Sequence, residues 1–555
     1  MVNKMKMSDR SGLTKPRISK GRRVLIAAAG VFGAALISMG IFLAIEWPKG
    51  SLSRSTGSLA SVQLKGIPQS IKRVSVVVNG KAVPVSDSGG NIVPTIKLPA
   101  STSASVTVYL RRPSWISWLV GGSEKLSEHI VTPSATLLDP VSVGPADTPV
   151  SSYFSTPVSE VLVSGSSGTK IINLPTPSST IVLNVASGSV GSVDIAASPD
   201  VWETLPNPSK MVYFRESTTA TVGFIDENLS SLSPMSPISL TLSKPISSVF
   251  GSSMPTLQPV IKGSLLPKGS WKIATPNSIV YTPTAPDFWP SEKFTLSFPS
   301  PIELASTGGS QLSSPTSKIS LEGASPSITR LQQLLAQLHY LPLSWKQASS
   351  GPTPTLAQQA QLALVAPSGT FAWRWTMPSP LTSLWQQGNY NVITKGAVMA
   401  FEQFNGLDTS GLANPLLWPT LINDVLTNKV DPHRYSWIEV NKILPQKLTL
   451  YENGSVVLTS LTNTGIKGLS TTNGTFPIYL RFKENYMSGT NPNGTTYHDR
   501  VYWINYFLGS EAVHGFPRAQ YGFQQSLGCV ELPVSTAATV YPQVHIGTLT
   551  TILPS

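Results

Sequence analysis

The sequence HGFPRAQYGFQQSLGCV, residues 514–530, contains the only cysteine of the chain, Cys529, fifteen residues after His514. One thiol among 555 residues forms no intramolecular disulfide, and a free cysteine is commonly a small buried core residue. A histidine that the fold brings beside a thiol can instead accept its proton and make it a nucleophile. A glycine directly before the cysteine, here Gly528, allows the backbone to turn close to a bound carbonyl group. The surrounding pattern favours the catalytic interpretation over the core one.

The order and spacing of these residues resemble the catalytic signature of the L,D-transpeptidases, the YkuD family of bacterial cell-wall enzymes. That signature has a histidine and a small residue, a spacer, and then Ser-x-Gly-Cys followed by an aliphatic residue. The histidine precedes the cysteine here, whereas papain-like peptidases have the opposite order. The matching positions are His514, Gly515, Ser526, Gly528, Cys529 and Val530.

The resemblance implies roles for these residues. Cys529 is expected to be the nucleophile and His514 the general base, with the pKa of the thiol depressed by the imidazolium. The Gly515 carbonyl is expected to orient the imidazole, while Gly528 supports an oxyanion site formed by the Cys529 amide. Ser526 positions the loop or the substrate, or it is a turn residue that bonds its own backbone.

Three positions depart from the family pattern. Leu527 stands where a second histidine is frequent, and Glu531 stands where arginine or asparagine is common. Thr472 replaces the proline that usually follows a threonine upstream. The flanks of the cysteine are therefore where substrate handling is expected to differ from that of the family.

The resemblance covers the last part of the chain, for which we predict a β-rich catalytic domain over 432–555. Alternating residues on both sides of Asn453-Gly454 predict a β-hairpin. The Gly, Asn and Thr residues of 488–497 predict a flexible lid over the site, next to His498-Asp499. His545, in an apolar stretch, is expected in a terminal strand.

The front of the chain predicts a membrane anchor. Residues 1–23 carry eight Lys or Arg against one acid, a net charge of +7 (8 − 1), which predicts a cytoplasmic tail. Residues 24–45 contain no charged side chain, and at ~1.5 Å per residue a helix of that length spans a hydrocarbon core. A cleaved signal peptide is the alternative, but its apolar region usually has only about 7–15 residues. We therefore predict a single-pass anchor that places the rest of the chain outside a bacterial cell membrane, in the wall or the periplasm.

The overall composition limits the possible partners. Of the formal net charge of +12, the tail supplies +7, which leaves +5 (12 − 7) for the remainder. No concentrated basic stretch follows, so nucleic acid is not an expected partner. The six histidines show none of the short, regular ligand pairs of zinc sites, and no phosphate-loop pattern is present. We expect no metal and no organic cofactor.

Between the anchor and the catalytic domain we predict β-rich spacer modules. Short alternating or aliphatic runs recur between Pro, Gly and Asn residues, as in antiparallel sandwiches. Two such modules are expected at 55–142 and 150–230, in which Trp115, Trp118 and Trp202 are interpreted as buried anchors. Residues 231–303 resemble a bacterial immunoglobulin-like sandwich. The other interpretation of these modules is ligand binding.

Residues 326–424 change to a helical pattern. A first helix is expected to start at Ser325-Pro326, a second at Thr394, and a third at Asn414-Pro415. These runs resemble the repeats of the peptidoglycan-binding domain, interrupted by about 50 residues that include Phe371 and Trp375. The alternative is a packing module without a ligand.

Together these inferences predict a mainly β, multidomain, membrane-anchored L,D-transpeptidase. Its partners are expected to be peptidoglycan stem peptides, a donor tetrapeptide and an acceptor amine, and its product a cross-link made through an acyl-enzyme. Two alternatives stay open at this point. One is an L,D-carboxypeptidase that trims tetrapeptides, and the other is a catalytically degenerate wall-binding protein.

Overall fold

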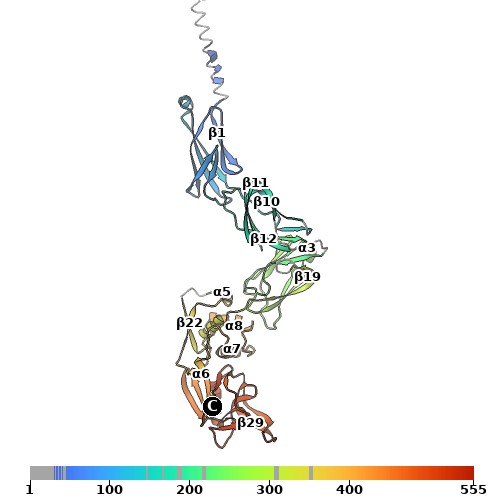
Figure 1. Cartoon of the computed structure of the whole chain (residues 1–555), viewed down its shortest axis with the longest axis vertical. Helices are drawn as coiled ribbons and strands as arrows, with labels where there is room; N and C mark the ends of the chain where they lie inside the picture. Colours follow the sequence, from blue (N-terminus) through green and yellow to red (C-terminus); the bar gives the residue numbers. More distant parts are fainter. Residues whose placement is uncertain are drawn as a thin grey trace, which may run out of the picture. The chain divides into compact units, whose positions relative to one another are not determined.

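The computed structural model describes residues 46–145, 148–165, 168–183, 190–215, 220–305, 312–348 and 354–555, with isolated positions between 31 and 41. The predicted tail, 1–23, and most of the predicted anchor, 24–45, lie outside these residues. No helix within the described ranges has the length and apolarity needed to cross a bilayer. The chain divides into two compact units, 1–217 and 218–555 (Figure 1).

The first unit begins with a module of two four-stranded sheets. One sheet has the order β1 (Lys49–Ser55), β2 (Ser58–Lys65), β6 (Asn91–Pro94), β5 (Val85–Ser88). The other has the order β4 (Lys81–Val83), β3 (Ser70–Val78), β7 (Ser103–Arg111), β8 (Ser123–Val131). Along β7 buried and less buried residues alternate, because successive side chains of a strand point to opposite faces. The core of this module is the row Ala104, Val106, Val108 and Leu110 with its facing residues.

The three tryptophans of this unit divide into two classes. Trp202 is buried in the core of the first module, as expected. Trp118 lies in the short helix α2 (Ser117–Val120) between β7 and β8, and its side chain is 81% exposed. Trp115, just before α2, is also exposed. The interpretation of Trp115 and Trp118 as buried anchors is therefore wrong, because they lie on a connection that leaves the sandwich.

The second module of this unit is a five-stranded sheet with one parallel edge. Its order is β11 (Gly168–Leu183), β10 (Val150–Gly165), β12 (Val190–Ser198), β13 (Ser209–Arg215), β9 (Val141–Gly144). The β13 and β9 strands are parallel and the other pairs are antiparallel. One face of the sheet carries the core residues, among them Val161, Ile195 and Met211.

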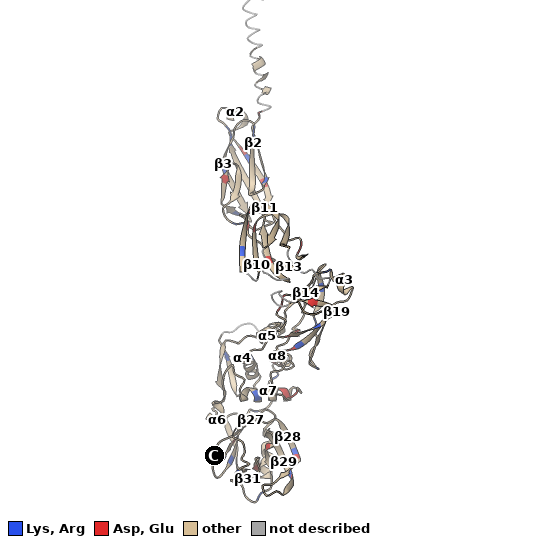
Figure 2. Ribbon diagram, turned by 45° about the vertical axis from the view of Figure 1, so that its right-hand side comes forward, with Lys and Arg blue, Asp and Glu red and all other residues tan. Residues whose placement is uncertain are grey.

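The second unit begins with a further β module, and Figure 2 shows that its acidic and basic residues are scattered along the ribbon. Its strands follow the order β16 (Thr256–Pro259), β19 (Lys293–Leu304), β14 (Val222–Ile225), β15 (Ile238–Leu242), β18 (Ser278–Thr282), β17 (Ser270–Thr275). β20 (Thr316–Glu322) also pairs with β19, and α3 (Ile246–Phe250) follows β15. Phe288 and Phe294 meet edge to face in the core, with ring centroids 5.4 Å apart.

The helical part starts its helices a few residues later or earlier than predicted. α4 (Ile328–Gln337) begins after Ser327, whose hydroxyl accepts the Arg330 N–H, so Ser325 is not the cap. α7 (Val392–Phe404) begins before Thr394, because the Asn391 side chain accepts the Thr394 N–H. α8 (Leu417–Thr427) follows Asn414, whose side-chain Oδ1 accepts the Leu417 N–H. Between these helices lie β21 (Leu343–Gln347), α5 (Leu356–Leu362), β22 (Gly369–Trp373) and α6 (Ser379–Thr382).

The C-terminal part is built on two sheets that enclose a core. One has the order β25 (Ser455–Leu461), β24 (Lys447–Glu452), β23 (Ser436–Asn441), β33 (Leu549–Ile552), β27 (Gly474–Pro477). The other has the order β28 (Leu480–Thr490), β29 (Thr496–Leu508), β30 (Glu511–Gly515), β32 (Val530–Leu532). A short parallel pair, β26 (Thr464–Gly465) with β31 (Gln524–Ser526), and α9 (Val534–Val540) complete it. Ile438, Leu450, Val513 and Val530 share the core.

Two predictions for this domain can be compared with its elements. The predicted hairpin is confirmed as β24 and β25, joined at Asn453-Gly454. The prediction of a strand around His545 is wrong, since the last strand begins at Leu549. His545 lies in a turn before it, and its ring centroid is 4.4 Å from that of His433, with the two ring planes tilted by 35°. The mainly β character of the chain is confirmed.

Candidate active site

Two parallel strands bring the sequence-predicted residues to one face. β30 pairs with β32 so that His514 lies opposite Glu531. Cys529 lies in the bend directly before β32, two residues before Glu531. All three residues line one cavity of about 570 Å³. The histidine and the cysteine, fifteen residues apart in the chain, therefore share one site.

The long hairpin β28–β29 forms a wall of this cavity. The two strands stay paired up to Thr490 of β28 and Thr496 of β29. Asn491 and Thr495 then close the turn, with the Asn491 N–H donating to the Thr495 carbonyl at 2.7 Å. The segment predicted as a flexible lid, 488–497, is thus the end of a β-hairpin, and Ser488, Asn491 and Tyr497 line the cavity. The lining residues that it contributes include Tyr486, Met487, Tyr497, Asp499 and Tyr506.

Cys529 is held as a neutral thiol in the resting site. Its side chain is half-buried, and its Sγ lies 3.6 Å from the Ser510 carbonyl oxygen. The pKa of the thiol is raised to about 12, chiefly by burial and in part by the carboxylates of Glu531 and Glu511, while the hydrogen bond with the Ala512 backbone opposes the rise. The depression of this pKa by an imidazolium requires a charged His514 and stays a prediction.

His514 is a buried, neutral base. Burial lowers the pKa of the imidazole, Glu531 opposes that effect, and Arg518 adds to it. Nδ1 lies 3.4 Å from the Gly515 carbonyl oxygen, so a proton on Nδ1 leaves the lone pair on Nε2. In the part of the chain that the structure describes, no hydrogen bond joins His514 to Cys529.

The residues directly before the cysteine form a tight turn. Ser526 Oγ donates to the Cys529 carbonyl oxygen at 2.5 Å and accepts the Gly528 N–H at 3.3 Å. Gly528 has a φ of +123°, a conformation that favours glycine. The Gly528 N–H is thus already used inside the turn, while Ser526 has the geometry of a turn residue. Leu527 also lines the cavity, where it offers no proton-transfer group.

Glu531 forms a buried ion pair that sequence reasoning missed. Arg518 Nε donates to Oε2 at 2.9 Å and Nη2 donates to Oε1 at 2.7 Å, a bidentate arrangement. The guanidinium carbon also lies 4.6 Å from the centre of the Phe516 ring. One signal was present in the sequence, because Arg518 is the only charged residue between His514 and Cys529. In this chain a guanidinium reaches the site from the loop before the cysteine. In the family pattern, an arginine is common two residues after the cysteine instead.

Thr472 also has a definite local role. Its hydroxyl donates to Glu511 Oε1 at 2.7 Å, and its backbone N–H donates to Oε2 at 3.1 Å. A proline at this position has no N–H and makes neither bond. Thr472, which stands where the family usually has a proline, therefore makes two hydrogen bonds to Glu511, the residue before Ala512 in β30.

The described residues contain no group of three His, Cys, Asp or Glu side chains placed to hold a metal ion. The chemistry that this geometry supplies is that of a thiol, an imidazole and a buried ion pair. Such a set fits acyl transfer through a covalent intermediate.

Residues 435–552 match the family model of the L,D-transpeptidase catalytic domain, YkuD. The resemblance predicted for 432–555 is thereby confirmed over these residues. No curated protein matches this chain.

Solved structures similar to the chain include an L,D-transpeptidase from Mycobacterium smegmatis, with 13% identity and a TM-score of 0.21, over 60% of this chain and 97% of that one. An L,D-transpeptidase from Stackebrandtia nassauensis has 16% identity and a TM-score of 0.19, over 42% and 98%. The catalytic domain of the E. faecium L,D-transpeptidase has 22% identity and a TM-score of 0.20, over 22% and 100%.

Proposed function

We propose that the chain is an extracytoplasmic, membrane-anchored L,D-transpeptidase that cross-links peptidoglycan through an acyl-enzyme on Cys529. The observation that carries the proposal is the shared cavity of Cys529, His514 and Glu531 inside the matched domain, 435–552. The apolar segment 24–45 and the basic tail before it support the anchoring. The β modules between anchor and enzyme act as a spacer.

In the first half-reaction, Cys529 passes its proton to Nε2 of His514 as its sulfur bonds to the donor carbonyl carbon. That carbon belongs to the third, dibasic residue of a stem tetrapeptide. The oxygen becomes an oxyanion, which the Cys529 N–H stabilises, and such a donor typically contributes ~2.7–4 kcal/mol. The carbon–nitrogen bond then breaks, and the terminal D-alanine leaves with the proton that His514 returns. The product is a thioester.

In the second half-reaction, the side-chain amine of another stem peptide attacks the thioester carbon. His514 removes the proton of the amine, the carbon–sulfur bond breaks, and the thiolate takes that proton back. A cross-link between third residues results. Water in place of the amine gives a tripeptide, which is carboxypeptidase activity.

The protonation states of Cys529 and His514 in the resting site support this order of events. A neutral thiol beside a neutral imidazole is unreactive until a substrate displaces water and the proton transfers. The enzyme is therefore expected to alkylate slowly with iodoacetamide at neutral pH but to acylate readily with a bound stem peptide.

The test incubates the full chain, purified in detergent, with disaccharide-tetrapeptides and separates the products by mass. A dimer that lacks one D-alanine supports the proposal. Tripeptide alone identifies a carboxypeptidase, and unchanged substrate rejects the enzyme. His514→Gln should remove the dimer, whereas His498→Gln, an exposed histidine bonded to Ser488, should leave it.

A carbapenem, a β-lactam class that acylates the family, separates an enzyme from a degenerate wall-binding protein. The intact mass should rise by one adduct in the wild type and not in Cys529→Ala. A wild type without an adduct, in a folded sample, contradicts the proposed nucleophile.

A further inference from the structure

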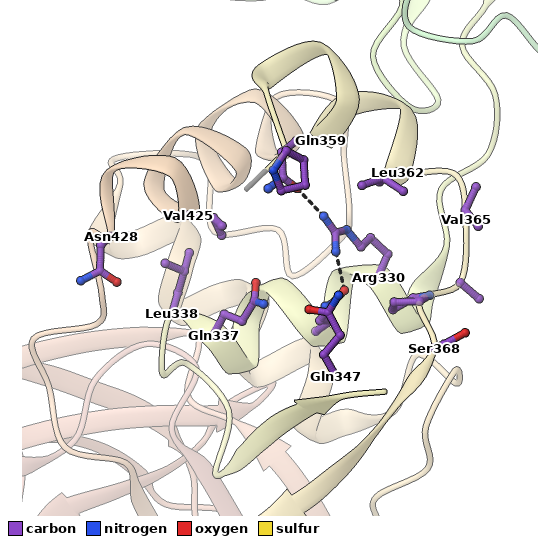
Figure 3. Close-up of a pocket in the computed structure, with 14 residues that line it drawn as sticks. Arg330, Gln337, Leu338, Gln347, Gln359, Leu362, Val365, Ser368, Val425 and Asn428 are labelled. Carbon is purple, nitrogen blue, oxygen red and sulfur yellow. Dashed lines mark hydrogen bonds between the residues drawn. The ribbon is translucent and has the colours of Figure 1, made fainter. Parts of the chain in front are cut away.

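A second cavity lies in the helical part of the unit, away from Cys529. It has a volume of about 700 Å³ and is bounded by α4, α5, the segment 365–368 and the end of α8 (Figure 3). Arg330 and Gln337, seven residues apart on α4, project into it from one helix face. Nothing in the predicted reaction uses this cavity.

The floor of the cavity is a buried arginine. The Arg330 residue is 7% exposed, and its Nη1 donates to Gln333 Oε1 at 2.5 Å while Nη2 donates to Gln359 Oε1. Both partners are neutral amides. Nε is buried and has no hydrogen-bond partner among the described residues. The side chain therefore keeps unused N–H donors inside a space that can hold a ligand.

The charge of Arg330 is also uncompensated. Across the described ranges it forms no ion pair, and burial alone accounts for a pKa lowered to about 10. A buried cation is costly unless an anion is paired with it. A guanidinium in this setting is prepared to receive an anionic ligand, since the desolvation has already taken place in folding.

The surrounding residues define the class of that ligand. The rim carries two exposed amides, Gln337 and Gln347, and two exposed aliphatic side chains, Leu362 and Val365. Amides can pair with peptide N–H and C=O groups, and the guanidinium fork matches a planar carboxylate. We propose that this cavity binds a peptide by its free carboxylate, with Arg330 as the anion-binding residue and Gln337 and Gln347 on the adjoining peptide group.

The test uses the full chain in detergent with Cys529→Ala, so that the catalytic cavity does not turn over the probe. N-acetyl-trialanine with a free carboxylate, its C-terminal amide and inorganic phosphate are titrated by calorimetry in the millimolar range. The acid should bind at least tenfold more tightly than the amide and than phosphate. Arg330→Gln should weaken binding of the acid at least tenfold, and Lys395→Gln, an exposed charge on α7, should not.

Several outcomes overturn the proposal. These are no binding of the acid, equal binding of acid and amide, and unchanged binding in Arg330→Gln. Phosphate binding as tight as the acid also overturns it, in favour of a phosphate site. Because Arg330→Gln can disturb folding, Gln347→Ala provides a second variant, which keeps both partners of Arg330 and should weaken the acid about threefold. An unchanged affinity in Gln347→Ala rejects the peptide contact.

Discussion

Two arginines of the same unit, one partly and one fully buried, differ in their hydrogen-bond partners. Arg518 reaches the catalytic cavity and is neutralised by Glu531 through two hydrogen bonds. Arg330 lies on the floor of the helical cavity with two glutamine carbonyl groups and no carboxylate. A carboxylate balances the charge of Arg518 without a ligand, whereas no carboxylate among the described residues balances that of Arg330.

The difference indicates what each cation does. A paired guanidinium fixes geometry and adjusts the proton affinity of its neighbour, here His514. An unpaired one is a cost to the fold that a bound anion would relieve. The presence or absence of a carboxylate partner thus separates a positioning residue from a ligand-binding residue.

The largest expected effect separates the two cavities completely. Cys529→Ala should reduce cross-linking by ~10⁴-fold, because no other group in the cavity replaces the nucleophile. The same variant should bind the acid-terminated peptide as tightly as the wild type does. Product mass and calorimetry measure the two properties, and a loss of both would mean that the cavities are coupled.

Removing the partner of Arg518 should make the first site resemble the second. Glu531→Gln leaves the guanidinium without a full counter-charge and should lower the free energy of unfolding by about 2 kcal/mol. The effect is smaller than for a fully buried pair, because the Arg518 side chain is 28% exposed. Urea denaturation measures it. The double variant Glu531→Gln/Arg518→Gln should recover most of the loss, and a double variant no more stable than the single one argues against an unpaired charge as the cause.

Removing the unpaired cation should have the opposite sign. Arg330→Met deletes a buried charge and keeps an unbranched apolar chain, so the free energy of unfolding should rise by about 1 kcal/mol. Lys395→Met, an exposed position on the same module, should give no gain. A clear decrease in stability for Arg330→Met, measured by urea denaturation, would show that the two glutamine bonds outweigh the cost of the charge.

The smallest effect is expected in the pH profile. His514 acts as a base only when neutral, and burial lowers its pKa, so activity should fall with acid only below the ordinary histidine value of ~6.5. Glu531 raises this pKa, so Glu531→Gln should move the acid limb of kcat/KM to lower pH. Arg518 lowers it, so Arg518→Gln should move the limb to higher pH. Shifts in the same direction would contradict the assigned electrostatic roles.

The sequence predicted well where the signal is local. The order His514, Gly528, Cys529 and the turn at Asn453-Gly454 are short patterns, so the matched domain, the shared cavity of His514 and Cys529, and the hairpin followed from them. Helix starts were displaced by a few residues, because Ser327 and Asn391 competed as caps with the predicted residues.

What the sequence did not give depends on distant packing. Arg518 becomes part of the site only because β30 and β32 are neighbours, which sets Glu531 within its reach. Arg330 occupies an ordinary first-turn position of an amphipathic helix, and its burial arises from α5, which lies across a separate stretch of chain. The strand pairing at 488–497, where a flexible lid was predicted, was missed because the Gly, Asn and Thr residues there show no strand alternation.

The joint between the helical part and the catalytic part carries a mechanical consequence. A Cβ on Gly396 of α7 would lie 2.5 Å from the carbonyl oxygen of Gly547, so the two backbones touch there with no side chain between them. Trp437 and Leu549 of the catalytic sheet extend the same core. A side chain at position 396 would collide with this backbone, so Gly396→Val should push α7 away from the segment that leads into the last strand. The absence of a side chain at this one position is thus a condition for the close contact between the helical part and the catalytic sheet.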